Sequence, residues 1–348
     1  MTTDAVAGSI LGCAVGDALG LPYENLSRRR GVRLLGEPTR HRLLFGRGMV
    51  SDDTEHTCMV AEALCAAPHD PEAFARDLAG RLRWWLLGAP AGVGFATLRA
   101  TINLWLGFGP ARSGVFSAGN GPAMRAAVLG AAIDDLALLR RFVEVNTRIT
   151  HTDPKALHGA FAVALAAWCA RRGMHGRFFD EWRAAAGIDP ADEFSGLMNP
   201  VEASIAAKEP TATFADANGC TKGVSGYVYR TVPACLHAWL SHPTDFRAAV
   251  QAVIRLGGDT DTTAAIVGGI VGAGVGRAGI PPEWVAGLWE WPRGVAWVGR
   301  LAEACAKALS SGEPIPSPRA IPLVGLARNA VFLAAVVGHV ARRLLPPY

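Results

Sequence analysis

The residues best suited to chemistry lie in Leu256–Gly276, which reads LGGDTDTTAAIVGGIVGAGVG. This segment places Asp259, Thr260, Asp261 and Thr262 directly before a run of small apolar residues that predicts a helix. Two carboxylates and two hydroxyls at one helix end are hard oxygen ligands, which suit a divalent cation such as Mg²⁺ or Mn²⁺. The alternative is that one of the aspartates simply caps the helix by accepting backbone hydrogen bonds.

A second acidic segment, Ser51–Thr57, reads SDDTEHT and also stands at the start of a predicted helix. Taken alone, it favours a capping box between Asp52 and Glu55, so a chemical role depends on the rest of the chain. His56 lies in the first turn, where a packed or hydrogen-bonded histidine is commoner than a ligand.

Glycines at every fourth position mark two predicted helices. They are Gly8, Gly12, Gly16 and Gly20 in the first helix, and Gly268, Gly272 and Gly276 in the second. Residues four apart share one helix face, and glycine lets another backbone come close. We therefore expect the two glycine faces to pack together. That packing would bring Asp17 and Glu24 near the acidic turn. The glycines themselves are expected to serve helix packing alone.

Two other segments could line a pocket. GNGPAMR turns the chain at Asn120 and Gly121 before a helix, and His151 lies just before another helix in THTDP. The imidazole of His151 could face a pocket or bond to the backbone of its own turn. Tyr227 opens a further helix in SGYV.

The chain as a whole predicts one all-α domain spanning residues 1–348. Of these residues 50% are hydrophobic and 18% are charged, which is typical of a globular protein with a large core. No segment shows the sustained alternation of apolar and polar residues that a sheet requires, and no repeat or linker divides the chain.

Composition also argues against several classes of partner. The net charge of +4 is too weak and dispersed to indicate nucleic acid, and the one tight basic cluster, Arg28–Arg30, is expected on a solvated loop. Seven cysteines without a C-x-x-C pair disfavour disulfides and zinc, and indicate a reducing, cytoplasmic location. Ala5–Gly20 and Asn329–Ala341 are shorter than the ~20 apolar residues of a membrane span, so we expect buried helices and no membrane.

Four segments in this order resemble the ADP-ribosylglycohydrolase family. They are GCAVGDALGLPYE (Gly12–Glu24), SDDTEHT (Ser51–Thr57), GNGPAMR (Gly119–Arg125) with ITHTDP (Ile149–Pro154), and LGGDTDTTAAIVG (Leu256–Gly268). The resemblance implies a compact, orthogonal all-helical domain with two Mg²⁺ or Mn²⁺ ions. Its metal ligands would be Ser51, Asp52, Asp53, Asp259, Asp261 and Thr262.

The resemblance also implies an activity. The chain would hydrolyse ADP-ribose from a modified protein side chain, in arginine or serine linkage, or from a related small molecule. Residues Gly119, Asn120, Gly121, His151 and Tyr227 match positions that contact ADP-ribose. Either Glu24, which matches a movable glutamate near the metals, or Asp53 would be the general acid or base.

One departure from the family pattern bears on function. The loop Pro90–Gly94 reads PAGVG, so Gly92 falls where many nitrogenase-regulating members have an aspartate. This difference counts against assigning the chain to the nitrogenase system.

Two other functions are compatible with the same residues. One is a two-metal phosphoesterase acting on a nucleotide, and the other is a non-catalytic ADP-ribose-binding or toxin-neutralising protein. A decayed site should have lost ligands, whereas all six ligand positions still carry oxygen donors.

Overall fold

The computed structural model describes residues 2–185, 193–319 and 322–344. The α-helices are, in chain order, α1 (Thr2–Gly20), α2 (Arg28–Leu35), α3 (Asp52–Ala66), α4 (Pro71–Leu86), α5 (Phe95–Trp105), α6 (Gly121–Met124), α7 (Ala127–Ala132), α8 (Leu136–Arg148), α9 (Pro154–Ala170), α10 (Phe178–Ala185), α11 (Glu193–Ala206), α12 (Thr211–Ala217), α13 (Val228–Ser241), α14 (Phe246–Ile254), α15 (Thr260–Val275), α16 (Pro282–Gly287), α17 (Val295–Ser311) and α18 (Pro322–Arg342). Short 3₁₀ turns lie at η1 (Leu21–Tyr23), η2 (His175–Arg177) and η3 (Arg277–Gly279). Extended pairing within the described residues is limited to isolated bridges. The all-α prediction is confirmed.

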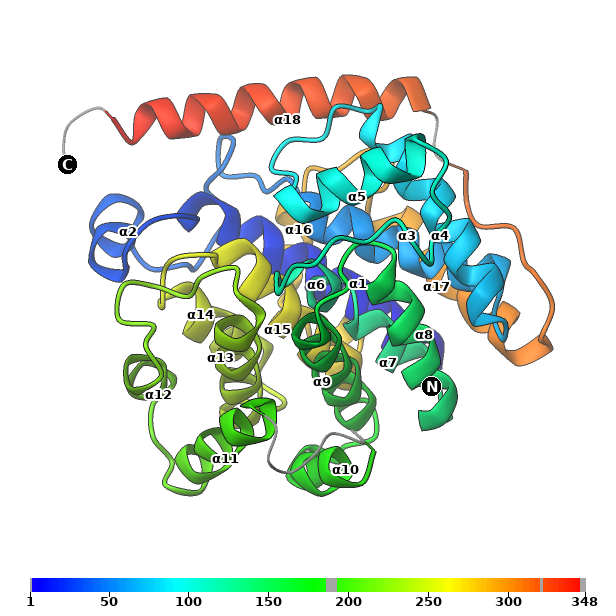
Figure 1. The fold of residues 1–348 in the computed structure, drawn as a ribbon. Helices are drawn as coiled ribbons and strands as arrows, with labels where there is room; N and C mark the ends of the chain where they lie inside the picture. Colours follow the sequence, from blue (N-terminus) through cyan, green and yellow to red (C-terminus); the bar gives the residue numbers. More distant parts are fainter. Residues whose placement is uncertain (1, 186–192, 320–321, 345–348) are drawn as a thin grey trace.

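Helices α1 and α15 lie side by side at the centre of the molecule, and the other helices surround them (Figure 1). Their glycine faces meet in antiparallel order, as the spacing predicted. A Cβ atom at Gly8 would overlap the carbonyl oxygen of Gly272, and one at Gly12 would overlap that of Gly268. The two backbones are therefore in direct contact, and no side chain larger than hydrogen fits between them.

The same contact continues toward the acidic turn. A Cβ atom at Gly16 would overlap the carbonyl of Ala264, and one at Gly20 would overlap that of Thr260. The Thr260 hydroxyl also donates a hydrogen bond to the Gly20 carbonyl over 2.9 Å. At the opposite end Gly276 closes α15 with φ of 66°, and its Cα atom would lie only 2.9 Å from a Cβ atom at Gly8, so Gly276 also belongs to the packed face.

The surrounding helices complete the core on all sides of this pair. Helix α15 contacts α14, α9 and α13, while α1 contacts α17, α7 and α3. Helix α1 is apolar around its whole circumference, which is the pattern of a helix buried on every side. Its buried charge, Asp17, is fully enclosed.

The basic cluster Arg28–Arg30 was expected on a loop, and that expectation was wrong. These residues begin α2, and Arg28 donates hydrogen bonds to the Leu256 carbonyl and to Asp216. Because Leu256 leads into the acidic turn, this arginine helps to anchor it.

Two helices reach the length and apolar composition of a membrane span. In the first, Thr3–Tyr23, the apolar stretch is completely buried in the core, which accounts for its apolar sequence. The second, Val324–Arg342 in α18, is only 17% buried, so the expectation of a buried helix was wrong for this segment. Helix α18 lies across one side of the molecule (Figure 1). It contains Arg328, whose buried guanidinium forms an ion pair with Glu290.

The glycine contact leads to a stability prediction. We expect Gly272→Ala to lower the free energy of unfolding by ~1–3 kcal/mol, because the added methyl group forces two backbones apart. Gly299→Ala on α17 is the control: its Cβ atom would meet nothing within 4 Å, so the better helix propensity of alanine should stabilise by ~0.5–1 kcal/mol. Chemical denaturation of both variants measures the difference. Equal stabilities would contradict the close contact.

Candidate active site

A cleft of about 800 Å³ lies where the acidic segments meet. Its walls include ten of the residues predicted from the sequence, namely Glu24, Asp52, Asp53, Gly119, Asn120, Gly121, His151, Asp259, Asp261 and Thr262. Ser51 and Tyr227 lie behind this surface and contact residues that form it. The fold thus collects the predicted site residues from six separate parts of the chain.

Ser51 and Asp17 fix the start of α3. Ser51 is the N-cap, and its side-chain oxygen accepts a hydrogen bond from the Asp53 N–H, so the capping box expected between Asp52 and Glu55 is not used. The Asp17 carboxylate accepts hydrogen bonds from the Ser51 N–H at 2.9 Å and from the Thr54 hydroxyl at 2.6 Å. Asp17 is therefore a supporting residue that sequence reasoning undervalued. The feature of the sequence that could have indicated this role is a charged residue inside an otherwise apolar helix.

Asp53 joins the two acidic segments. Its Oδ2 atom accepts hydrogen bonds from the Ser51 and Thr262 hydroxyls, both at 3.2 Å. Its Oδ1 atom is buried without a hydrogen-bond partner, and so is the Oδ1 atom of Asp261. Buried carboxylate oxygens without donors are costly, so these two atoms indicate a place for a cation or a proton.

Asp259 occupies the N-cap position of α15, but its side chain makes no capping hydrogen bond. Its Oδ2 atom instead accepts a hydrogen bond of 2.7 Å from the Asn120 side-chain amide. The preceding Gly257 and Gly258 have φ of 74° and 84°, in the left-handed region that glycine permits. These glycines turn the chain sharply so that the carboxylate is directed away from the helix end and toward Asn120.

The carboxylates of the cleft raise one another's pKa. Burial, followed by the charges of neighbouring carboxylates, raises the pKa values of Asp52, Asp53 and Asp261 well above the usual range. Burial raises the pKa of Asp17 to about 7, although its hydrogen bonds act in the opposite direction. Burial and the charge of Asp259 also raise the pKa of Glu24. The cluster therefore favours uptake of positive charge.

The carboxylate and hydroxyl oxygens of the cleft are chemically suitable ligands for a pair of divalent cations. Carboxylates and hydroxyls are the ligands that Mg²⁺ and Mn²⁺ prefer, and two of the carboxylate oxygens lack partners. As the side chains stand, however, no three His, Cys, Asp or Glu residues among those described are arranged to hold a metal ion. Part of the predicted set consists of serine and threonine hydroxyls, and the carboxylates would have to adjust on binding.

The Gly119–Gly121 turn forms another part of the cleft wall and packs on His151. A Cβ atom at Gly119 would lie 3.0 Å from His151 Nε2, so the ring fills the space beside the turn. The ring nitrogen Nδ1 hydrogen-bonds the Thr150 hydroxyl at 2.9 Å. Burial, and then the charge of Arg125, lower the pKa of His151 to about 3, which keeps its ring neutral.

The backbone of this turn is tied to the start of α13. The Asn120 N–H donates to the Gly226 carbonyl at 3.0 Å, and Gly119 forms an antiparallel bridge with Tyr227. The Tyr227 hydroxyl accepts a hydrogen bond from Lys155 at 3.1 Å. Tyr227 therefore supports the turn from behind, and the Asn120 N–H is already engaged within the protein.

His56 and Gly92 also have definite places. His56 is buried, and its Nδ1 atom accepts a 3.1 Å hydrogen bond from the Arg125 guanidinium, so it is a packed residue as expected. Gly92 lines the cleft, and a Cβ atom there would lie 3.9 Å from Asp52 Oδ1. A side chain at position 92 would thus point at the acidic cluster, where this chain supplies none.

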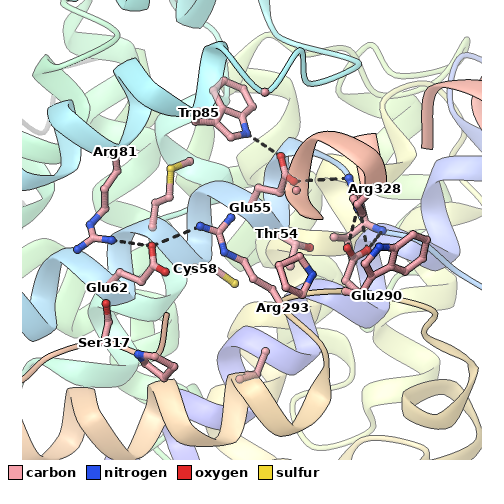
Figure 2. A pocket seen from close by; sticks show the side chains of 18 of the residues that line it. Thr54, Glu55, Cys58, Glu62, Arg81, Trp85, Glu290, Arg293, Ser317 and Arg328 are labelled. Carbon is pink, nitrogen blue, oxygen red and sulfur yellow. Dashed lines mark hydrogen bonds and ion pairs between the residues drawn. The ribbon is translucent and has the colours of Figure 1, made fainter. Parts of the chain in front are cut away.

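A larger cavity, of about 1160 Å³, lies on the other side of α3. Figure 2 shows its charged side chains paired with one another. Glu62 pairs with Arg81, and Glu55 and Glu290 pair with Arg328. We assign the chemistry to the smaller cleft because its carboxylates lack such partners.

Comparison with known proteins agrees with this geometry. The sequence profile described as ADP-ribosylglycohydrolase matches residues 1–314. An uncharacterized protein of Archaeoglobus fulgidus is 34% identical over 80% of this chain and 90% of its own length. The ADP-ribosyl-[dinitrogen reductase] glycohydrolase of Rhodospirillum rubrum is 29% identical over 82% of this chain and 90% of its own.

A solved structure shows the same fold. It is described as an ADP-ribosylglycohydrolase-related protein complex, and it superimposes with a TM-score of 0.61 at 26% identity. The match covers 88% of this chain and 99% of that one. The chain therefore belongs to the ADP-ribosylglycohydrolase family.

Proposed function

We propose that this chain is a metal-dependent hydrolase that removes ADP-ribose from a modified acceptor. The acceptor would be a protein side chain in arginine or serine linkage, or a related small molecule. The observation that carries the proposal is Asp53, which joins the two acidic segments through one oxygen and leaves the other without a partner. Family membership supports the class of reaction. The cysteine content supports a cytoplasmic location.

Six residues would hold two Mg²⁺ or Mn²⁺ ions: Ser51, Asp52, Asp53, Asp259, Asp261 and Thr262. When bound, such ions supply charge neutralisation, orientation of the ribose hydroxyls and a water of lowered pKa. The hydroxyls of Ser51 and Thr262 already orient Asp53, and Asn120 orients Asp259. The chain thus prepares the carboxylates before any ligand arrives.

Glu24 is the better placed of the two candidate acid–base residues. It is partly exposed in the cleft, whereas Asp53 is 1% exposed and has one oxygen held by two hydroxyls. Burial and the charge of Asp259 raise the pKa of Glu24, which is the direction that favours uptake of a proton by a general base. The Gly119–Gly121 turn and His151 would contact the nucleotide, because glycine lets a ligand approach the backbone closely.

A comparison of substrates would determine which bond between ADP-ribose and its acceptor this protein hydrolyses. The purified protein is offered arginine-, serine- and nucleobase-linked ADP-ribose, and a nucleotide phosphoester, with Mg²⁺ or Mn²⁺, and product release is measured. Release of ADP-ribose from one of the glycosides supports the proposal. Cleavage of the phosphoester alone would indicate a phosphoesterase, and tight binding without turnover a non-catalytic protein. Since Gly92 gives no carboxylate beside Asp52, the substrate of the nitrogenase-related protein is not carried over.

Metal binding should require both acidic segments. We expect Asp52→Asn and Asp261→Asn each to weaken Mg²⁺ or Mn²⁺ binding by more than ~10-fold and to reduce turnover at least as much. Asp180→Asn on the exposed side of α10 is the control. Calorimetric titration gives the affinities. Unchanged affinity in both cleft variants would refute the ligand assignment.

The acidic cluster should also make stability depend on pH and metal. A carboxyl group whose pKa is raised by folding binds more protons in the folded state, so its contribution to stability is lost as pH rises. Without metal, we expect the free energy of unfolding to fall between about pH 4, where unfolded carboxyls titrate, and about pH 7, the pKa of Asp17. Saturating Mg²⁺ should restore stability most at the higher pH. A metal-free melting temperature that stays constant across this window would count against the cluster.

Glu24 can be tested apart from the metal ligands. We expect Glu24→Gln to retain metal affinity and ADP-ribose binding but to slow hydrolysis by ~10²–10⁴-fold, the usual loss for an acid–base group. Glu303→Gln, on an exposed position of α17, is the matched control. Metal affinity and turnover are measured on the same sample. A parallel fall in both would make Glu24 a ligand, and unchanged turnover would leave Asp53 as the base.

A further inference from the structure

We propose that α18, and Arg343 just after it, position the active site by holding the backbone of the segments that carry it. This inference rests on the proposed function for its activity measurements. The family profile ends at residue 314, so α18 lies outside the part of the chain that defines the family. The polar contacts of α18 nevertheless go to residues next to the acidic cluster.

The carboxyl-terminal end of α18 holds the loop of Glu24. Arg343 donates hydrogen bonds to the Pro22 carbonyl at 2.6 Å and to the Glu24 carbonyl at 2.9 Å. His339 makes a further contact of 3.0 Å with the Pro22 carbonyl. On its other side, the Asn25 N–H donates to the Gly258 carbonyl at 2.7 Å. The backbone around Glu24 is thus fixed between α18 and the acidic turn before α15.

The amino-terminal half of α18 holds the start of α3. Arg328 forms a paired contact with both oxygens of Glu290, at 2.6 and 2.7 Å (Figure 2). Together these two residues engage both backbone groups of Val50: Glu290 accepts from its N–H at 3.2 Å, and Arg328 donates to its carbonyl at 2.5 Å. Val50 directly precedes Ser51, so the pair sets the direction in which the acidic segment begins.

A third contact reaches the loop beside Asp52. The Asn329 side-chain amide donates to the Gly88 carbonyl at 2.8 Å, at the start of the loop that carries Gly92. Between the two ends of the helix, Phe332 and Ala335 pack on Leu21 and Met49. Leu21 lies three residues before Glu24, and Met49 lies three residues before Asp52.

The orientation of α18 argues that these contacts place the site rather than build the core. Its polar residues Arg328 and Asn329 face the protein, while Leu326 and Val337 are 47% and 58% exposed. Phe332 and Ala335 supply its buried apolar contacts, whereas a surface helix held mainly by an apolar face would also bury residues such as Leu326 and Val337. Most of the inward hydrogen bonds end on backbone carbonyls, which are groups that fix the path of a loop.

The test compares Arg343→Gln with Arg342→Gln in the full chain. The two residues are neighbours of equal charge, and Arg342 is exposed. We expect Arg343→Gln to lower kcat by ~10-fold or more with KM changed less than ~3-fold, since a small misplacement of a catalytic group is costly. Arg343→Lys, which can still donate to one carbonyl, should recover much of the loss. Arg342→Gln should match the wild type.

Hydrogen exchange gives a readout that does not require activity. In Arg343→Gln, amides of residues 21–27 should exchange ~10-fold faster while those of 49–55 keep their protection. In Asn329→Ala, residues 86–92 should respond instead. If the wild type hydrolyses no ADP-ribosyl substrate, the proposed function fails and exchange alone still decides the role of α18. Identical kinetics and exchange in the Arg343 and Arg342 variants would overturn the inference, as would a kcat loss explained by a smaller folded fraction.

Discussion

The arrangement of the whole molecule depends on the backbone contact between α1 and α15. Glycines let the two helices approach until carbonyl groups occupy the space that side chains would need. At the last level of this contact, Gly20 meets Thr260, which stands between Asp259 and Asp261. Because the chain leaves α1 there and reaches Glu24 shortly afterwards, this backbone contact also fixes the distance between the two sides of the cleft. A wider helix pair would separate the acidic residues.

The acidic residues on opposite faces of α3 have different kinds of partner. Toward the larger cavity, Glu55 and Glu62 pair with arginines, which compensates for their burial. Toward the cleft, the partners of Asp53 are neutral hydroxyls, which orient a carboxylate without cancelling its charge. Helix α3 therefore anchors itself with one face and keeps negative charge available on the other. Because these charges are buried without cationic partners, the pKa values of Asp52 and Asp53 are raised well above the usual range.

Much of the support for the site comes from residues that would not contact a substrate. Asp17 holds the first turn of α3, Asn120 holds Asp259, and the Arg328–Glu290 pair holds Val50. Each of these contacts joins segments far apart in the sequence. A reacting group needs its neighbours fixed as well as its own side chain, because its direction is set by the backbone on which it stands.

The sequence by itself determined the helical class, the close packing of the two glycine faces and the identity of the acidic residues. Those features follow from local spacing, since residues four apart share a helix face and the acidic residues are clustered in two short segments. Only the tertiary structure decided that Ser51 caps α3, that Asp259 bonds to Asn120 instead of capping α15, and that the Asn120 N–H is used within the protein. It also decided that α18 is a largely exposed helix that holds the Glu24 loop. Each of these outcomes is a choice between hydrogen-bond partners distant in sequence, and side-chain type and spacing do not specify which partner comes within reach.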